Sequence, residues 1–326
     1  MSSESRSSPP HLALTAGDPA GIGPEIARAA LADPRVREAA RLTVLGPAAA
    51  RPDEVPAPHA WSATDGPDEW RMGEVQAECG RAALAALRAG AALAESGAAG
   101  ALVTGPVSKA ALHLAGEEVE GQTELLARWA GVARYGMLAI AGPLRVLLLT
   151  RHMPLKRALE RITPASVLEH LELLDSALRE LGCERPRIAL AGLNPHAGEG
   201  GLLGDEEQLL LEPALALACD RGILASGPHS PDALFPRAAR GEFDGVLALY
   251  HDQAFIPVKL LSGAQGVTLI AGLPYLRVSP VHGTAFDIAG TGRASPENLI
   301  QAILFAAREA RRRAGRGAEE VSAPHE

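Results

Sequence analysis

The stretch GVLALYHDQ at residues 245–253 decides the fold class, because a short apolar run passes directly into three polar side chains. The same order occurs in LRVLLLTRH at residues 144–152 and in RIALAGLNPH at residues 187–196. Such runs, alternating with alanine-rich segments at helical spacing, are typical of an α/β protein with a largely parallel sheet. Ligands of such sheets collect beyond the carboxyl ends of the strands. We therefore expect the functional residues to follow the strands.

The pattern around these stretches predicts further strands and helices. Expected strands cover residues 12–16, 41–46, 100–105, 137–150, 187–193, 245–250 and 266–272. Expected helices cover about residues 75–93, 164–181, 205–221 and 296–313. Thr163 and Ser295 each precede a proline, which is the order of an N-cap and a first helical residue. The segment 47–70 is rich in proline and glycine and is expected to be a surface excursion.

The composition excludes several classes of protein. The chain has 31 basic and 39 acidic residues, a net charge of −8, which disfavours binding to nucleic acid through bulk charge. Its 3 cysteines have no paired spacing, so we expect no disulfide framework and a reducing, cytoplasmic location. No apolar run approaches the ~20 residues of a membrane span. We expect no membrane partner, and disordered tails at residues 1–10 and 316–326.

Three histidines occupy equivalent positions. His152, His196 and His251 lie one to three residues past three separate expected strands, so they converge if those strands are neighbours in one sheet. Three imidazoles with an open position are the ligand set expected for a catalytic zinc or a similar divalent ion. From spacing alone, this hypothesis is as well supported as the alternative that each histidine is an ordinary loop residue.

Glycine-rich segments suggest further binding loops. GDPAGIGPE at residues 17–25 is not a dinucleotide fingerprint, because Ile26 stands where the third glycine is required. VTGPVSKAAL at residues 103–112 either holds an anion through backbone N–H groups and Lys109 or is a plain strand-to-helix turn. HGTAFDIAGTGRASPENL at residues 282–299 carries more constraints than a generic connection needs, which favours a cofactor loop.

Together these motifs resemble the PdxA family, the 4-hydroxythreonine-4-phosphate dehydrogenases of pyridoxal phosphate biosynthesis and their relatives that act on other phosphorylated hydroxy acids. The matching blocks run in family order from about Leu12 to Arg311 and are GDPAGIGPE, VTGPVSK, GQTE, HMPL, GLNPHAGEGG, YHDQ, GLPYLR and HGTAFDIAG. The resemblance implies two α/β/α domains of the isocitrate and isopropylmalate dehydrogenase type, formed by residues 11–130 with 270–315 and by residues 131–269. It also implies a homodimer with the active site in the interdomain cleft at the dimer interface.

The resemblance assigns roles to individual residues. One divalent metal per site (zinc, cobalt, magnesium or manganese) is implied at His152, His196 and His251. NAD or NADP is implied at the cofactor loop, through His282, Gly283, Thr284, Asp287 and Gly290. Contacts to a phosphorylated hydroxy acid are implied for Gln122, Thr123, Lys259, Thr268 and Arg277. Lys259 and Asp252 are the candidates for the proton acceptor.

Two positions depart from the family pattern. Gln122 replaces the usual histidine and Thr268 the usual asparagine, and both changes concern substrate contacts. The implied reaction is the NAD-dependent, metal-dependent oxidation and decarboxylation of 4-phosphohydroxy-L-threonine to 3-amino-2-oxopropyl phosphate. Three alternatives stay open: a dehydrogenase for threonate or erythronate phosphate or for a cis-dihydrodiol carboxylate, a metal-dependent hydrolase or lyase on the same fold, and a non-catalytic metal-binding protein.

Overall fold

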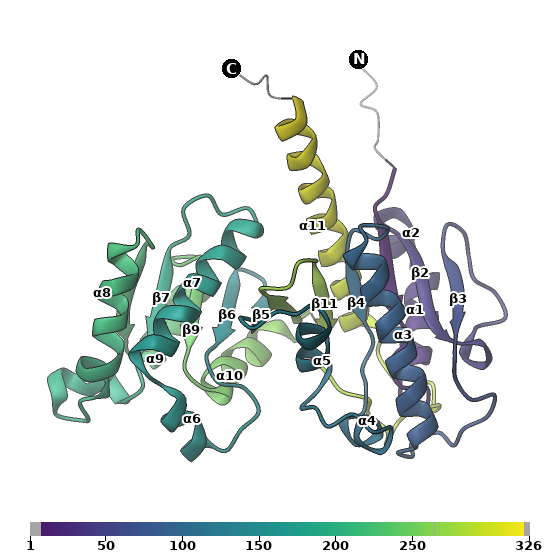
Figure 1. Ribbon diagram of the computed structural model, residues 1–326, viewed down its shortest axis with the longest axis horizontal. Coiled ribbons are helices and arrows are strands. Elements are labelled where there is room, and N and C mark those ends of the chain that lie inside the picture. Colours follow the sequence, from purple (N-terminus) through teal and green to yellow (C-terminus); the bar gives the residue numbers. More distant parts are fainter. Residues whose placement is uncertain (1–7, 264, 323–326) are drawn as a thin grey trace. The chain divides into compact units, whose positions relative to one another are not determined.

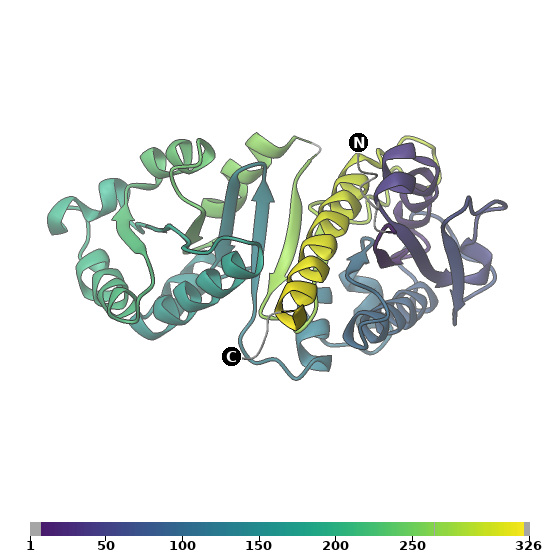
Figure 2. The ribbon, with the colours of Figure 1, turned by 90° about the horizontal axis from the view of Figure 1, so that it is seen from above.

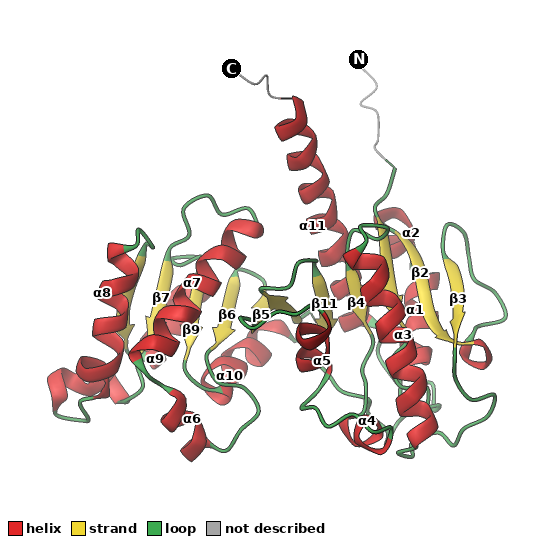
Figure 3. Ribbon diagram, in the orientation of Figure 1, coloured by secondary structure: helices red, strands yellow, loops and turns green. Residues whose placement is uncertain are grey.

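The computed structural model describes residues 8–263 and 265–322, in which helices and strands alternate along the chain (Figures 1 and 3). The predicted α/β class is confirmed. The chain divides into two compact units: unit 1 comprises Met1–Leu126 and Pro274–Glu326, and unit 2 comprises Ala127–Leu273. Each boundary lies four residues from the one that the sequence predicts.

Unit 1 contains a parallel sheet with the strand order β3-β2-β1-β4-β11. These strands are β1 (His11–Thr15), β2 (Arg41–Pro47), β3 (Ala60–Thr64), β4 (Leu102–Thr104) and β11 (Arg277–Pro280). The segment 47–70, expected to be a surface excursion, contributes β3 to the edge of this sheet. Leu12, Leu14, Leu42 and Leu102 are fully buried, because parallel strands are covered on both faces.

The long helix α3 of unit 1 packs against β1, β2 and β4 and contacts α4, whereas α11 packs against β11 and contacts α1 and α2. The bounds are α1 (Gly23–Ala32), α2 (Pro34–Ala39), the 3-10 turn η1 (Ala48–Ala50), α3 (Ala77–Glu95), α4 (Lys109–Leu114) and α11 (Glu297–Ser322); α5 (Gln122–Trp129) crosses the unit boundary. The segment from residue 316, expected to be a disordered tail, is instead helical as far as Ser322. Alanine, arginine and glutamate are strong helix formers, which accounts for the longer helix. Residues 1–7 and 323–326 of the expected tails lie outside the described residues.

Unit 2 has the strand order β10-β5-β6-β9-β7-β8. Its β10–β5 and β5–β6 pairs are antiparallel, and its β6–β9, β9–β7 and β7–β8 pairs are parallel. The strands are β5 (Gly136–Ala141), β6 (Leu144–Leu148), β7 (Ile188–Ala191), β8 (Ala225–His229), β9 (Gly245–Ala248) and β10 (Val267–Ala271). The expected run 137–150 is therefore a hairpin, turning at Gly142, which has a φ of 58°.

Helices lie on both faces of the unit 2 strands (Figure 2). On one face α9 and α10 bury Leu234, Phe235, Ala254 and Val258 against β5, β6, β7 and β9. The helical segments of unit 2 are α6 (Leu155–Arg161), α7 (Pro164–Glu180), η2 (Pro195–Gly201), η3 (Glu207–Leu211), α8 (Glu212–Asp220), α9 (Pro231–Ala239) and α10 (His251–Ser262). The predicted cap of α7 is confirmed, because Thr163 Oγ1 accepts from Ser166 N at 3.1 Å. None of the helices between residues 8 and 322 has an apolar stretch long enough for a bilayer crossing.

Candidate active site

The strands that precede the three candidate metal ligands are neighbours in unit 2. β6, β9 and β7 lie side by side and run parallel, so their carboxyl ends meet at one edge of the sheet. His152 follows β6, His196 follows β7 and His251 follows β9. The three strands are therefore neighbours in one sheet, as the predicted convergence of the histidines requires.

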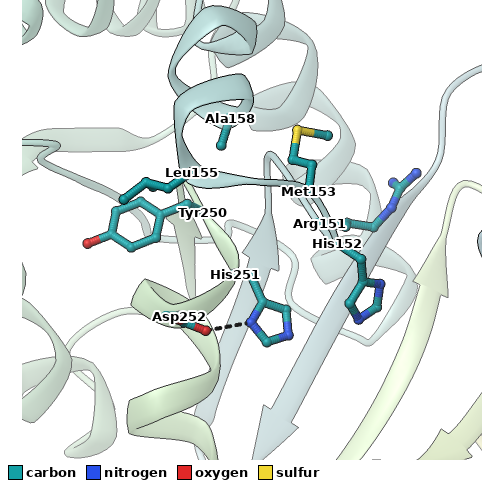
Figure 4. A pocket seen from close by; sticks show the side chains of 8 residues that line it. All are labelled: Arg151, His152, Met153, Leu155, Ala158, Tyr250, His251 and Asp252. Atoms are coloured by element: carbon teal, nitrogen blue, oxygen red, sulfur yellow. Dashed lines mark hydrogen bonds and ion pairs between the residues drawn. The ribbon is translucent and has the colours of Figure 1, made fainter.

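His152 and His251 lie together at this edge. Their ring centroids are 5.2 Å apart. Both line a pocket of about 250 Å³, in which Figure 4 shows the two rings beside each other. The other lining residues are Arg151, Met153, Leu155, Ala158, Tyr250 and Asp252. Two imidazoles in one open pocket provide two of the nitrogen ligands that a divalent ion of the zinc type prefers.

His251 is the first residue of α10, and its neighbours on that helix orient it. Its Nδ1 lies 2.7 Å from Asp252 Oδ1, the interaction drawn as a dashed line in Figure 4. A carboxylate that accepts from Nδ1–H leaves Nε2 with the lone pair for a metal, which is the usual arrangement around ligating histidines. The Phe255 ring stacks on His251 at 4.7 Å, and Lys259 Nζ lies 5.8 Å from the Phe255 ring centre. Lys259 therefore continues the helix face that begins with His251.

His196 does not complete a triad within one copy of the chain. Among residues 8–263 and 265–322, no three histidine, cysteine, aspartate or glutamate side chains are grouped so that they could hold a metal ion. Residues 196–200 of η2, His196 among them, all have positive φ, from 46° to 77°. His196 thus stands in an irregular left-handed segment that follows β7.

The buried carboxylate of Glu207 anchors the two residues that precede η2. Glu207 is 2% exposed and accepts hydrogen bonds from the backbone N–H groups of Leu193 and Asn194, at 2.8 and 2.7 Å. Its second oxygen accepts from Asn194 Nδ2 at 2.9 Å. Burial alone would raise the pKa of Glu207, but the hydrogen bonds from Asn194, Leu193 and its own backbone N–H together lower the pKa. The sequence shows a pair of glutamates after a glycine-rich loop, but it does not show which of the two side chains is buried.

Three predicted substrate contacts lie in unit 1. Gln122 Nε2 donates to the carbonyl oxygen of Gly105 at 3.0 Å, and Thr123 is 5% exposed. Arg277 is 4% exposed, and its Nη2 donates to Thr104 Oγ1 at 2.6 Å. Burial lowers the pKa of the Arg277 guanidinium to about 10. The structure thus brings Gln122 and Arg277 to the carboxyl end of β4. Thr268 lies in unit 2, buried within β10.

The candidate cofactor residues His282, Gly283, Thr284, Asp287 and Gly290 lie in the loop between β11 and α11 of unit 1. Thr284 O accepts from Ile22 N at 3.0 Å, and Glu25 Oε2 accepts from Gly290 N at 3.1 Å, so the loop is joined to the glycine-rich start of α1. A pocket of about 340 Å³ lies against it, lined in part by Glu25, Trp70 and Gly290. The Nε2 of His282 is buried without a hydrogen-bond partner among the described residues. This unsatisfied ring nitrogen of the loop is available to a bound polar ligand.

Comparison with known proteins identifies the family. The chain is 41% identical to a 4-hydroxythreonine-4-phosphate dehydrogenase of Geobacter metallireducens, covering 93% of this chain and 96% of the relative. It is also 41% identical to a D-threonate 4-phosphate dehydrogenase of Bordetella bronchiseptica, covering 91% and 92%. A crystal structure of 4-hydroxythreonine-4-phosphate dehydrogenase from Klebsiella pneumoniae matches with a TM-score of 0.85 at 39% identity, covering 94% of this chain and 99% of that one. The family model described as pyridoxal phosphate biosynthetic protein PdxA matches residues 25–306, and the chain therefore belongs to the PdxA family.

Proposed function

We propose that this protein is an NAD-dependent, metal-dependent dehydrogenase that oxidises and decarboxylates 4-phosphohydroxy-L-threonine to 3-amino-2-oxopropyl phosphate. The observation that carries the proposal is the pair His152 and His251, 5.2 Å apart at a sheet edge, in a chain whose relatives bear dehydrogenase names. These rings fit a divalent ion because the His251 Nδ1 is engaged by Asp252, which leaves the other ring nitrogen to bind.

We further propose that His196 of the partner subunit supplies the third nitrogen in a homodimer. When bound, the divalent ion lowers the proton affinity of the substrate hydroxyl and stabilises the negative charge that develops on oxygen. Asp252 holds His251 in the orientation required for binding. Because this carboxylate is engaged by an imidazole, Lys259 on the same helix is the better candidate for accepting the hydroxyl proton.

The remaining proposed roles concern orientation of the reactants. The loop with His282, Gly283, Thr284, Asp287 and Gly290 binds the dinucleotide, which accepts the hydride when bound. The buried guanidinium of Arg277 binds a phosphate or carboxylate group of the substrate. Gln122, Thr123, Thr268 and Lys259 make the other substrate contacts.

The test is a turnover panel on protein that has been stripped of metal with a chelator. Zinc, cobalt, magnesium or manganese is added back singly, and NADH and carbon dioxide are measured with 4-phosphohydroxy-L-threonine, D-threonate 4-phosphate and a cis-dihydrodiol carboxylate. We expect both products from the first substrate in a metal-dependent manner. NADH from D-threonate 4-phosphate alone would reassign the substrate, because relatives of equal identity carry that name. A protein that does not bind NAD would instead favour a hydrolase or lyase.

Measurement of bound metal tests whether the histidine pair holds the ion. His251→Ala should lose turnover and bound metal, because one of the paired imidazoles is removed. The matched control is His113→Ala, since the imidazole of this exposed residue contacts the carbonyl oxygen of Val119 in unit 1. Equal metal stoichiometry in the two variants would count against the proposed ligands.

A further inference from the structure

The buried guanidinium of Arg277 forms no ion pair with a carboxylate among the described residues, although the partly buried Glu124 attracts it from further away. Among the described residues its guanidinium has one hydrogen bond, to the neutral hydroxyl of Thr104, and its Nε is buried without a partner. Removing a cation from water is costly unless an anion or several acceptors compensate. One neutral acceptor and a carboxylate that is not hydrogen-bonded to the guanidinium provide only part of that compensation, which leaves donors of Arg277 available to an anionic ligand.

Thr104 is placed where its hydroxyl can hold this guanidinium. β11 pairs with β4 so that Arg277 lies opposite Leu102, and Thr104, two residues further along β4, lies on the same face. Thr104 is fully buried. The next residue is tied to β1, because Gly105 N donates to Thr15 O at 2.9 Å and a Cβ on Gly105 would lie 2.7 Å from that oxygen. The hydroxyl of Thr104 therefore stands on a rigid part of the sheet.

A second candidate substrate contact is attached to the same place. Gln122 Nε2 donates to Gly105 O at 3.0 Å, and because a carbonyl oxygen only accepts, the amide nitrogen must face it. The opposite atom, Gln122 Oε1, is buried without a partner among the described residues. Thr104, the last residue of β4, and Gly105, which follows it, thus hold the side chains of Arg277 and Gln122. Each of these two side chains has a buried polar atom without a hydrogen-bond partner among the described residues.

We propose that Thr104 is a positioning residue whose hydroxyl oxygen holds the Arg277 guanidinium in the orientation that binds an anionic group of the substrate. A neutral acceptor suits this task better than a carboxylate, because a carboxylate would neutralise the guanidinium and compete with the ligand. The inference rests on the proposed function only in naming that anion as the phosphate or carboxylate of 4-phosphohydroxy-L-threonine.

The test compares Thr104→Val, which removes the hydroxyl but keeps the shape, with Thr104→Ser, which keeps the hydroxyl. We expect Thr104→Val to raise KM, and the Kd for the substrate measured without NAD, about 10-fold, which corresponds to about 1.4 kcal/mol. The kcat and the Kd for NAD should change less than about 3-fold, and Thr104→Ser should restore substrate affinity. Thr43→Val is the control, because Thr43 Oγ1 contacts His11 Nε2, at 2.8 Å, on another strand of unit 1.

A double-mutant cycle identifies the partner through which Thr104 acts. In an Arg277→Met background, Thr104→Val should have little further effect on substrate affinity, because the group that it positions is absent. An undiminished effect in that background would overturn the proposal. So would unchanged substrate affinity in a folded Thr104→Val protein, or an equal loss of NAD affinity.

Failure of the proposed function can be told apart from failure of this inference. If the wild-type protein does not turn over 4-phosphohydroxy-L-threonine, inorganic phosphate becomes the probe, and its affinity is measured by calorimetry. Weaker phosphate binding by Thr104→Val than by the wild type and Thr104→Ser would support the positioning role even then. A wild-type protein that binds neither ligand would overturn it.

Discussion

Three buried residues with ionisable side chains have three different hydrogen-bonding environments. Glu207 accepts several N–H groups, and Arg277 has a single neutral acceptor. Asp18, which is fully buried, accepts from Ala20 N at 3.0 Å through one oxygen, while its Oδ2 has no partner among the described residues. Burial raises the pKa of Asp18 to about 6, although the backbone N–H groups of Ala20 and Ser108 act in the opposite direction. The folded protein therefore binds this proton more tightly than the unfolded chain does.

The Asp18→Asn variant should gain stability relative to the wild-type protein as the pH rises. The raised pKa means that Asp18 costs the wild type stability progressively between about pH 4 and pH 6, by at most about 3 kcal/mol, whereas an amide has no such dependence. The carbonyl oxygen of the substituted amide would still be able to accept from Ala20 N. Urea unfolding at about pH 4 and about pH 8 measures the change.

The exposed carboxylate of Asp53 provides the control, as Asp53→Asn removes an acid at the surface of the same unit. A free-energy difference between Asp18→Asn and wild type that is the same at both pH values would show that Asp18 is not held in the raised-pKa state.

Among the elements, η2 has the most unusual backbone. His196, Ala197 and Glu199 adopt positive φ values, 53°, 52° and 46°, that side chains with a Cβ rarely take. Gly198 is required there, because a Cβ would lie 2.8 Å from Glu207 Oε2. Strained backbone persists only where the surrounding structure maintains it, and here the carboxylate of Glu207 anchors Leu193 and Asn194, the two residues that precede the element. The residues with this unfavourable backbone thus include His196, a candidate metal ligand.

Glu207→Gln should destabilise this element. The amide cannot accept from Leu193 N and Asn194 N and also from Asn194 Nδ2, so at least one donor loses its partner, at a cost of about 2 kcal/mol. Urea unfolding measures the loss, and limited proteolysis should show faster cleavage within residues 195–204. Glu212→Gln, an exposed site on α8, is the matched control. Equal stability of the two variants would contradict the anchoring role.

At the scale of the whole molecule, one copy of the chain brings together two of the three proposed metal ligands. His152 and His251 share a pocket, and no third ligand joins them within the described residues of a single chain. A two-fold dimer places the same surface of each copy against the other, so a residue from each copy can complete the site of its partner. The proposed homodimer would then have two composite sites.

Mixing two inactive variants tests this arrangement. His196→Ala and His251→Ala should each be inactive alone, and after unfolding and refolding together should regain roughly a quarter of wild-type turnover, because heterodimers of a two-fold assembly contain one intact site. Bound metal should return in the same proportion. Refolding each variant by itself controls for recovery caused by handling. No recovery in mixed samples that contain heterodimers would mean that each site is built from one chain.

Part of the fold and of the candidate site could be predicted from the sequence. The polar ends of the runs at 144–152, 187–196 and 245–253 indicated the α/β class and the three histidines, because strand periodicity and strand-end chemistry are local properties. The same reasoning missed β3, β8 and β11. The residues of β3 are largely exposed, and β8 contains a glycine and a proline, so the pairing of these strands depends on the neighbouring strand more than on their own composition.

The sequence by itself determined which chemical groups the protein possesses and at which strand ends they stand. Only the tertiary structure decided that β9 lies between β6 and β7, that His152 and His251 but not His196 line one pocket, and that Arg277 is buried against Thr104. The physical reason is that strand order, burial and hydrogen-bond partners arise between segments far apart in the chain. Their energies depend on the environment that those segments create together, which no local pattern records.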